Sequence, residues 1–269
     1  MRNASEIMLE AVKEHRPKEV FVGFSGGTDS QAVTHWVMTN IPSAKCFHAN
    51  TGIGVEQTRE YVRQTCAKFG WPLVEIRAKE DCGQDYDELV LDQGFPGPPQ
   101  HRKMYNRLKE RCVRELVRRH KSRRSDRILI ATGIRHDESR IRAGYADRVV
   151  NREGAQVWVN PIYWWSGSDK AAYLRQVDMP VNPVAQTLGM SGECLCGAFA
   201  SRGELALVRT IDPDVADRID ALEKRCRAKG FDWGWEEGKT TRKKAAPVDA
   251  EREQPMCVSC NKAGRERYA

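Results

Sequence analysis

The chain has 269 residues, of which 40% are hydrophobic and 30% are charged, and its net charge is +7. This composition supports a folded core and excludes a wholly disordered chain. No stretch approaches the ~18 apolar residues that a membrane helix needs, and the N-terminus has no apolar signal-peptide run, so we expect a soluble, cytoplasmic protein that does not associate with membranes.

Strand-like and helix-like segments alternate in the first half of the chain. In chain order, the pattern predicts a helix over 5–14 with Ser5 as its N-cap, a strand over 18–24, a helix over 29–39, a strand over 45–49, a helix over 56–69, a strand over 73–76, a Gly/Pro-rich loop over 94–99, a basic helix over about 101–120 and a strand over 127–132. This alternation predicts an α/β fold, with a parallel sheet covered by helices on both faces.

The pattern changes after about residue 145. We expect a hairpin that turns at Glu153-Gly154, a short helix over 169–177, a Pro-rich stretch and a last helix over about 214–229. We therefore divide the chain into a nucleotide-binding α/β core (1–148), an extension with the hairpin, a Cys-x-Cys segment and the last helix (149–237), and a polar tail with a Cys-x-x-Cys pair (238–269).

The positive charge is concentrated in one segment. Residues 101–148 contain 16 Lys or Arg and 6 Asp or Glu, whereas the rest of the chain has 28 against 31. Such a segment suits a polyanionic partner, either the phosphates of a nucleotide or a nucleic-acid backbone. A solvated basic helix without a partner is the alternative.

The segment from Ser25 to Ser30, Ser-Gly-Gly-Thr-Asp-Ser, has the features of a phosphate loop. It stands between a predicted strand and a predicted helix, so Gly26 and Gly27 can turn tightly beside a ligand while the helix start offers unpaired N–H groups. The hydroxyls of Ser25, Thr28 and Ser30 add polar groups. Asp29 beside phosphates suggests an intervening cation such as Mg²⁺. The alternative is a simple turn before a capped helix.

This segment matches the Ser-Gly-Gly-x-Asp-Ser signature of the PP-loop, or N-type, ATP pyrophosphatases. It is not a Walker A loop, because no Gly-Lys-Ser/Thr follows. The resemblance implies a Rossmann-like fold of the adenine nucleotide α-hydrolase type, and cleavage of ATP between its α and β phosphates.

Three further segments resemble the phosphoadenosine phosphosulfate (PAPS) reductase-like branch of that family. The first is 48–53, where Asn50 replaces the usual Asp before Thr51-Gly52; the second is 132–142; the third runs from Pro161 to Asn182-Pro183. The resemblance implies that Thr51, Gly52, Gly133 and Arg135 join residues 25–30 at the nucleotide, with Asp29 and Arg135 as catalytic residues. It also implies that Glu138, Ser139, Arg140 and Arg142 bind an acceptor phosphate or sulfate, since arginines bind such oxygens bidentately.

Nine cysteines occur, and in a cytosolic chain we do not expect them to form disulfides. The pairs Cys194/Cys196 and Cys257/Cys260 have metal-ligand spacing, which suits Zn²⁺ and an iron–sulfur cluster equally well. The family resemblance favours a [4Fe–4S] cluster over Zn²⁺ and adds Cys112 as a candidate ligand. Cys112 also fits a purely structural place in an apolar stripe with Tyr105, Leu108 and Leu116, and Cys196 is either the fourth ligand or a sulfur-handling thiol. We interpret the other four cysteines as structural.

We infer three possible functions from these features. The leading hypothesis is an ATP pyrophosphatase that adenylylates an acceptor for sulfur transfer, with DNA or tRNA as acceptor and a cysteine desulfurase as sulfur donor; PP-loop relatives of this kind include DNA phosphorothioation proteins and tRNA thiolases. The second is a PAPS or APS reductase, which the lack of a C-terminal Glu-Cys-Gly-Leu-His segment disfavours. The third is a non-catalytic, zinc-containing nucleic-acid-binding module.

Overall fold

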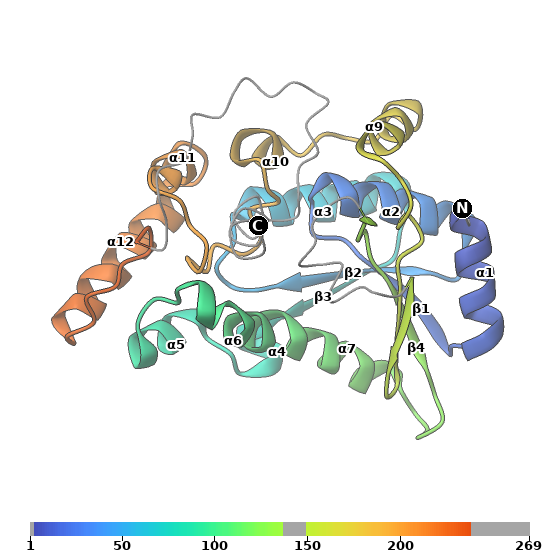
Figure 1. Ribbon diagram of the computed structural model, residues 1–269, viewed down its shortest axis with the longest axis horizontal. Helices are drawn as coiled ribbons and strands as arrows, with labels where there is room; N and C mark the ends of the chain where they lie inside the picture. Colours follow the sequence, from blue (N-terminus) through green and yellow to red (C-terminus); the bar gives the residue numbers. More distant parts are fainter. Residues whose placement is uncertain (1–2, 137–148, 238–269) are drawn as a thin grey trace.

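A six-stranded sheet lies at the centre of the computed structural model, which describes residues 3–136 and 149–237 (Figure 1). Its strands are β1 (Glu19–Gly23), β2 (Lys45–Asn50), β3 (Leu73–Arg77), β4 (Ile128–Ala131), β5 (Val150–Glu153) and β6 (Gln156–Val159), in the order β3-β2-β1-β4-β6-β5. All neighbouring pairs are parallel except β5–β6. The expected parallel sheet is therefore confirmed, with one antiparallel strand at its edge.

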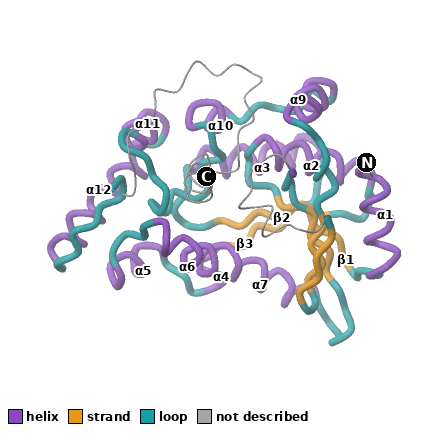
Figure 2. The backbone as a smooth tube through the Cα atoms, viewed as in Figure 1, coloured by secondary structure: helices purple, strands orange, loops and turns teal. Residues whose placement is uncertain are grey.

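Helices cover both faces of this sheet (Figure 2). The α-helices are α1 (Ala4–His15), α2 (Thr28–Asn40), α3 (Glu56–Phe69), α4 (Ala78–Cys82), α5 (Tyr86–Gln93), α6 (His101–Tyr105), α7 (Arg111–His120), α9 (Gly167–Gln176), α10 (Pro183–Leu188), α11 (Glu204–Ile211) and α12 (Pro213–Ala228), and a short 3₁₀ turn spans Pro98–Gln100. Helices α1 to α3 lie on one face and α4 to α7 on the other, while α11 and α12 lie at one end. Within the described ranges, no helix is long and apolar enough to cross a membrane.

Two apolar cores form, one on each face of the sheet. Alternate residues of β1 point to opposite faces and belong to different cores. Phe21 packs with α7, whereas Val20 and Val22 pack with α1 and α2. This explains why the central strands read as continuous apolar runs, as expected for a sheet that is buried on both faces. The sheet thereby fixes the carboxyl ends of β1, β2 and β4, from which the candidate site is built.

The hairpin of β5 and β6 belongs to the main sheet. Its two-residue turn is Gly154-Ala155, one position after the predicted Glu153-Gly154, because Glu153 still pairs with Gln156, and Gly154 has a φ of 63°. Strand β6 then pairs in parallel with β4, from Ile128 opposite Gln156 to Ala131 opposite Val159. The segment that starts at residue 149 therefore begins with two strands of the main sheet.

Two local predictions need correction. Helix α1 starts at Ala4 rather than Ser5, because Asn3 caps it: the Asn3 side chain accepts from the Glu6 N–H and Glu6 accepts from the Asn3 N–H, each at 2.9 Å. The predicted basic helix over 101–120 is interrupted by a π-helical turn, η2 (Asn106–Glu110). The wider turn shifts the register, so Leu108, Cys112 and Leu116 are buried whereas Tyr105 is 42% exposed.

Candidate functional site

The phosphate loop is fixed by hydrogen bonds that hold its backbone in a turn. Gly26 has a φ of 82°, and its carbonyl accepts from the side-chain amides of Gln31 at 3.1 Å and Asn182 at 3.0 Å. A Cβ on Gly26 would lie 2.9 Å from Thr58 Cγ2, so only glycine fits. The Ser30 hydroxyl donates to the Gly27 carbonyl at 2.7 Å, closing the turn from inside.

The start of helix α2 lies at the carboxyl end of β1 and has the geometry of an anion site. Gly27 is its N-cap and supplies no side-chain cap to the first turn. The first N–H groups of α2 and its positive dipole end therefore point into the loop, where phosphate oxygens bind well. Helix α2 begins at Thr28, one residue before the predicted start at residue 29.

Asp29 lies inside the site and pairs with two cations. Its Oδ1 is 2.6 Å from Arg135 Nε and 3.1 Å from Lys170 Nζ, and all three side chains are buried. Arg135 follows β4 and also donates to the Trp165 carbonyl at 3.2 Å. Sequence reasoning placed Asp29 and Arg135 together, and the structure joins them directly.

A Mg²⁺ ion beside Asp29 does not fit this arrangement. Two positive groups already share Oδ1, and a divalent cation placed at the same oxygen would be repelled by both. Arg135 and Lys170 therefore occupy the position at Oδ1 that the sequence suggested for Mg²⁺.

Gly133 permits the close approach of β4 to the phosphate loop. A Cβ at this position would lie 2.6 Å from the Asp29 carbonyl oxygen and 3.0 Å from the Ser30 nitrogen. Gly133 thus belongs to the site through its lack of a side chain, and any larger residue would displace the start of α2.

The second predicted segment, at the carboxyl end of β2, contacts a residue that sequence reasoning did not select. The Thr51 N–H and hydroxyl both donate to Glu193, the N–H to Oε1 at 2.9 Å and the hydroxyl to the backbone carbonyl at 2.6 Å. Gly52 has a φ of 75°, and Asn50, which replaces the family's acid, accepts from its N–H at 3.0 Å. The Asn50 side chain therefore stabilises the turn at Thr51-Gly52.

Glu193 lies in a buried charged network with His48 and Arg59. Its Oε2 is 3.1 Å from His48 Nε2 and 3.5 Å from Arg59 Nε. Burial alone would lower the pKa of His48, but the charge and hydrogen bond of Glu193 outweigh it, so that pKa is raised. Burial would raise the pKa of Glu193, yet His48, Arg59 and the Thr51 N–H lower it. Since His48 Nδ1 faces the Phe24 carbonyl at 2.7 Å, both its nitrogens face acceptors, as a charged imidazolium requires.

The segment from Ser191 to Cys196 connects the phosphate loop with the cysteines. Ser191 Cβ lies 3.6 Å from the position of a Cβ on Gly27. The segment then runs along the loop before α3: Val55 donates to the Gly192 carbonyl at 2.9 Å, and Leu195 donates to the Ile53 carbonyl at 2.9 Å. It is also held from the far side, because the Trp235 indole donates to the Leu195 carbonyl at 2.8 Å.

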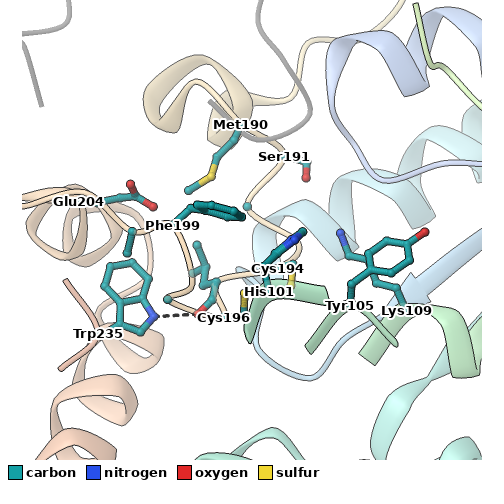
Figure 3. A pocket seen from close by; sticks show the side chains of 14 residues that line it. His101, Tyr105, Lys109, Met190, Ser191, Cys194, Cys196, Phe199, Glu204 and Trp235 are labelled. Atoms are coloured by element: carbon teal, nitrogen blue, oxygen red, sulfur yellow. Dashed lines mark hydrogen bonds between the residues drawn. The ribbon is translucent and has the colours of Figure 1, made fainter. Parts of the chain in front are cut away.

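A pocket opens beside this segment, and both thiols of the Cys-x-Cys pair line it (Figure 3). The helix from 101 contributes His101, Tyr105 and Lys109, and Phe199 lies against His101 with their ring centroids 4.8 Å apart. Ser191 lines the same pocket. The phosphate loop and the thiol pocket therefore share Ser191 as a common wall.

The donor set of this pocket fits part of a metal or cluster site. Two cysteines converge with a lysine nearby, and soft thiolate ligands suit Zn²⁺ or an iron–sulfur cluster. Within the described residues no group of three or more ligand-type side chains forms, so further ligands would come from elsewhere. Cys257 and Cys260 are the candidates by spacing, and they lie outside the described residues.

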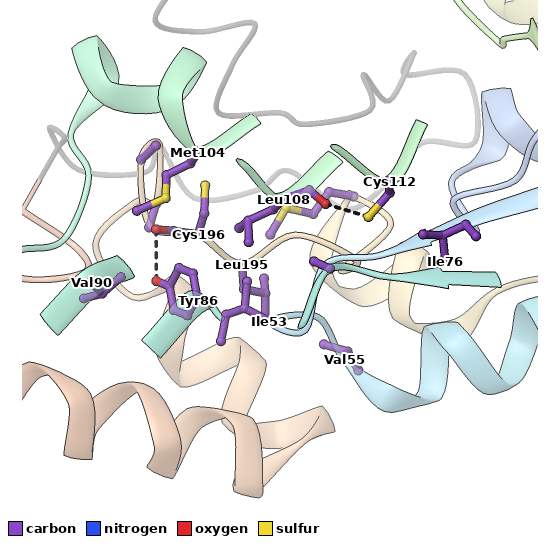
Figure 4. Packing of buried hydrophobic residues seen from close by; sticks show 14 of the residues in the cluster. Ile53, Val55, Ile76, Tyr86, Val90, Met104, Leu108, Cys112, Leu195 and Cys196 are labelled. Carbon is purple, nitrogen blue, oxygen red and sulfur yellow. Dashed lines mark hydrogen bonds between the residues drawn. The ribbon is translucent and has the colours of Figure 1, made fainter. Parts of the chain in front are cut away.

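Cys112 does not line this pocket. It is fully buried between Leu108 and Leu116, and its thiol donates to the Leu108 carbonyl at 3.2 Å (Figure 4). Burial raises the pKa of the Cys112 thiol, which contacts the Cys82 thiol. These surroundings favour the structural alternative for Cys112. Among the described residues, Cys46, Cys66, Cys82, Cys112 and Cys226 form no disulfide.

The acceptor-binding candidates Glu138, Ser139, Arg140 and Arg142 also lie outside the described residues. Part of the basic segment is described, and many of its charges are paired. Arg114 pairs with Glu110 at 3.1 Å, and Arg119 pairs with Asp81 at 2.6 Å. By contrast, three exposed cations of this segment have no acidic partner among residues 3–136 and 149–237: Arg102, Lys103 and Arg111.

Three functional-site residues escaped sequence reasoning, namely His48, Lys170 and Glu193. Each is at most 6% exposed, which is unusual for a polar or charged side chain. Glu193 stands directly before Cys194, and His48 lies within a segment that resembles the family. No motif or spacing in the sequence indicated a role for Lys170.

Comparison with known proteins supports the fold and the family. The model of the phosphoadenosine phosphosulfate reductase domain matches residues 19–188. A phosphoadenosine 5'-phosphosulfate reductase from Thiocapsa roseopersicina is 26% identical over 181 residues, which are 64% of this chain and 68% of that protein. A tRNA-5-methyluridine(54) 2-sulfurtransferase from Pyrococcus horikoshii is 35% identical over 77 residues, or 28% of this chain and 24% of that protein. The crystal structure of the PAPS reductase from Candida auris superposes with a TM-score of 0.50 at 15% identity, covering 67% of this chain and 82% of that one.

Proposed function

Because this chain belongs to the phosphoadenosine phosphosulfate reductase domain family, we propose that it is a PP-loop ATP pyrophosphatase that adenylylates an acceptor for sulfur transfer, with nucleic acid as the acceptor. The observation that carries this proposal is the shared wall at Ser191, which places a phosphate loop and a pair of thiols side by side. Activation of an oxygen and its replacement by sulfur need both groups within reach of one acceptor atom.

In the proposed reaction, residues 25–30 hold the ATP phosphates at the start of α2. An acceptor oxygen attacks the α-phosphorus, the bond from that phosphorus to the bridging oxygen breaks, and pyrophosphate leaves. The terminal sulfur of a persulfide on a donor such as a cysteine desulfurase then attacks the activated atom of the acceptor, the bond from that atom to the adenylylated oxygen breaks, and AMP leaves. A second thiol then attacks the donor's sulfur in the resulting acceptor–donor disulfide, which releases the thiolated acceptor and leaves a disulfide between the two thiols. Arg135 and the helix start offset the charge that develops on the phosphates, so this chain contributes chiefly positioning and electrostatics.

Two observations support a nucleic-acid acceptor. First, Arg102, Lys103 and Arg111, which have no acidic partner in the described part of the chain, belong to the same continuous helical segment as the pocket residues His101, Tyr105 and Lys109. Phosphate backbones bind such cations. In addition, the relative from Pyrococcus horikoshii is named a tRNA sulfurtransferase. Glu138, Ser139, Arg140 and Arg142 stay candidates for the acceptor phosphate.

We propose that Cys194, Cys196, Cys257 and Cys260 hold a [4Fe–4S] cluster, with Zn²⁺ as the alternative. When bound, such a cluster offers an iron to which sulfur can attach. The chain's own part is to hold Cys194 and Cys196 rigidly, through the Leu195 backbone bonds to Ile53 and Trp235.

Sulfonucleotide reduction is a second candidate, favoured by the similarity to the reductase from Thiocapsa roseopersicina. It would use the same phosphate loop for PAPS or APS and would not cleave ATP. The two reactions therefore differ in their nucleotide product.

Pyrophosphate release distinguishes these functions. We expect anaerobically purified protein to release pyrophosphate from ATP, and to do so faster when tRNA or DNA is added. Release of adenosine 3',5'-bisphosphate from PAPS without any pyrophosphate from ATP would support the reductase instead. Absence of both products would contradict an enzymatic role and leave the nucleic-acid-binding module.

Metal analysis tests the cysteine assignment. We expect iron and sulfide in the anaerobically purified protein, and we expect Cys194→Ser to lose most of both because it removes a ligand from the pocket. The matched control is Cys82→Ser, a half-buried thiol outside the pocket, which should keep the wild-type iron content. Zinc in place of iron, or equal loss in both variants, would contradict the proposed cluster site.

A further inference from the structure

Helix α9 buries one side chain, and that side chain is a lysine. Lys170 is 6% exposed, whereas the other residues of Gly167–Gln176 are half-buried or exposed. The helix packs beside α2, whose start forms the phosphate loop. A buried lysine costs free energy unless polar groups compensate for the lost water, so its surroundings indicate what the charge is for.

The ammonium group of Lys170 reaches the phosphate loop itself. Its Nζ lies 3.2 Å from Thr28 Oγ1 and 3.1 Å from Asp29 Oδ1. An ammonium has three N–H donors, and these two acceptors are the contacts that it makes within residues 3–136 and 149–237. One donor therefore stays available at the start of α2, beside the N–H groups that point into the loop.

Asp29 determines where the ammonium stands. Its Oδ1 accepts from Lys170 and from Arg135, so a single carboxylate fixes both cations next to the loop. This differs from an exposed lysine that approaches a phosphate from solvent, because the buried ammonium is already oriented and partly desolvated. A preorganised cation of this kind binds an anion more strongly than a mobile one.

We propose that Lys170 is a phosphate-binding residue of this site, which donates its third N–H to an oxygen of the phosphate chain on Gly26–Ser30. The inference rests on the proposed function, since it needs a nucleotide at the phosphate loop. Lys170 then favours ligands with a phosphate chain over the nucleoside alone, and Asp29 acts as its positioning residue.

Equilibrium binding of ATP, pyrophosphate and adenosine to the full chain tests this role. Lys170→Met keeps the length of the side chain but removes the charge, and we expect it to weaken binding of ATP and of pyrophosphate by about ten- to a hundredfold. Adenosine affinity should stay unchanged. The matched control is Lys224→Met, which removes an exposed lysine of α12 and should not alter any of the three affinities.

A merely structural role predicts a different pattern. In that case Lys170→Met would lower the melting temperature yet bind ATP as the wild type does, and the inference would be overturned. Lys170→Gln provides a second variant that keeps a hydrogen bond to Asp29 without the charge, and we expect the same loss of ATP affinity from it. If the wild type binds neither ATP nor pyrophosphate, the proposed function itself is wrong, which is distinguishable from failure at Lys170 alone.

Discussion

Replacing Asp29 by asparagine is expected to abolish ATP turnover and to destabilise the protein together. The amide keeps the shape of the side chain but leaves Arg135 and Lys170 as two buried cations without their shared carboxylate. Loss of one partner of a buried ion pair costs about 3–5 kcal/mol, and misplacement of both cations should slow catalysis by more than about a hundredfold. Urea unfolding and pyrophosphate release measure the two effects.

The control for this experiment is Asp232→Asn, since Asp232 is exposed and its carboxylate makes no ion pair among the described residues. We expect that variant to unfold and to turn over as the wild type does. If Asp29→Asn kept the wild-type free energy of unfolding, the ion pairs would not stabilise the fold. If it kept the wild-type turnover, Asp29 would have no part in the reaction.

The second large effect is expected for Glu193→Gln. This substitution removes the negative charge that His48 and Arg59 share and preserves the size of the side chain. We expect the free energy of unfolding to fall by about 3–5 kcal/mol. For a chain of this size, that loss lowers the melting temperature by roughly 6–20 °C. Glu80→Gln, an exposed residue of α4, is the control and should melt with the wild type.

The pH dependence of the stability difference between the wild type and Glu193→Gln shows whether the ion pairs of Glu193 cause it. The pKa of His48 is raised above its usual 6.5, so its contribution is fully present below about pH 6.5 and is lost as the pH rises through the folded-state value. The pKa of Glu193 is lowered from 4.5, so its contribution is present above about pH 4.5 and is lost as the pH falls through the lowered value. The free energy of unfolding of the wild type should therefore exceed that of Glu193→Gln most clearly between about pH 4.5 and pH 6.5. An equal difference at every pH would contradict the ionic origin of the effect.

Local signals in the sequence were sufficient for much of the fold. Helix α3 has the predicted bounds, Glu56–Phe69, because its apolar residues recur at helical spacing and Gly70 ends it in the left-handed conformation. By contrast, α10 has 6 residues and α11 has 8, too few for a periodic pattern to stand out from the surrounding loops. The short helices α4 and α5 were missed for the same reason.

The candidate site was predictable only where one local segment defines it. Residues 25–30 could be recognised because the strand, the two glycines and the helix start are consecutive. Its distant partners had no such local signal: Arg135, 106 positions from Asp29, was predicted only through the family resemblance, and Glu193, 142 positions from Thr51, was not predicted. Such pairs depend on how the sheet brings strand ends together, and no local pattern encodes them.

The segment Ser191–Cys196 lies beyond the family match, which ends at residue 188. A fragment cut there would keep every strand of the sheet yet lose Glu193, which supports the end of β2, and Ser191, which lies against the phosphate loop. It would also lose Trp235, a buried residue of the core that donates to the Leu195 carbonyl. The limit of the family match is therefore not the limit of the packed core, and we expect a fragment that ends at residue 188 to be less stable than one that includes Trp235.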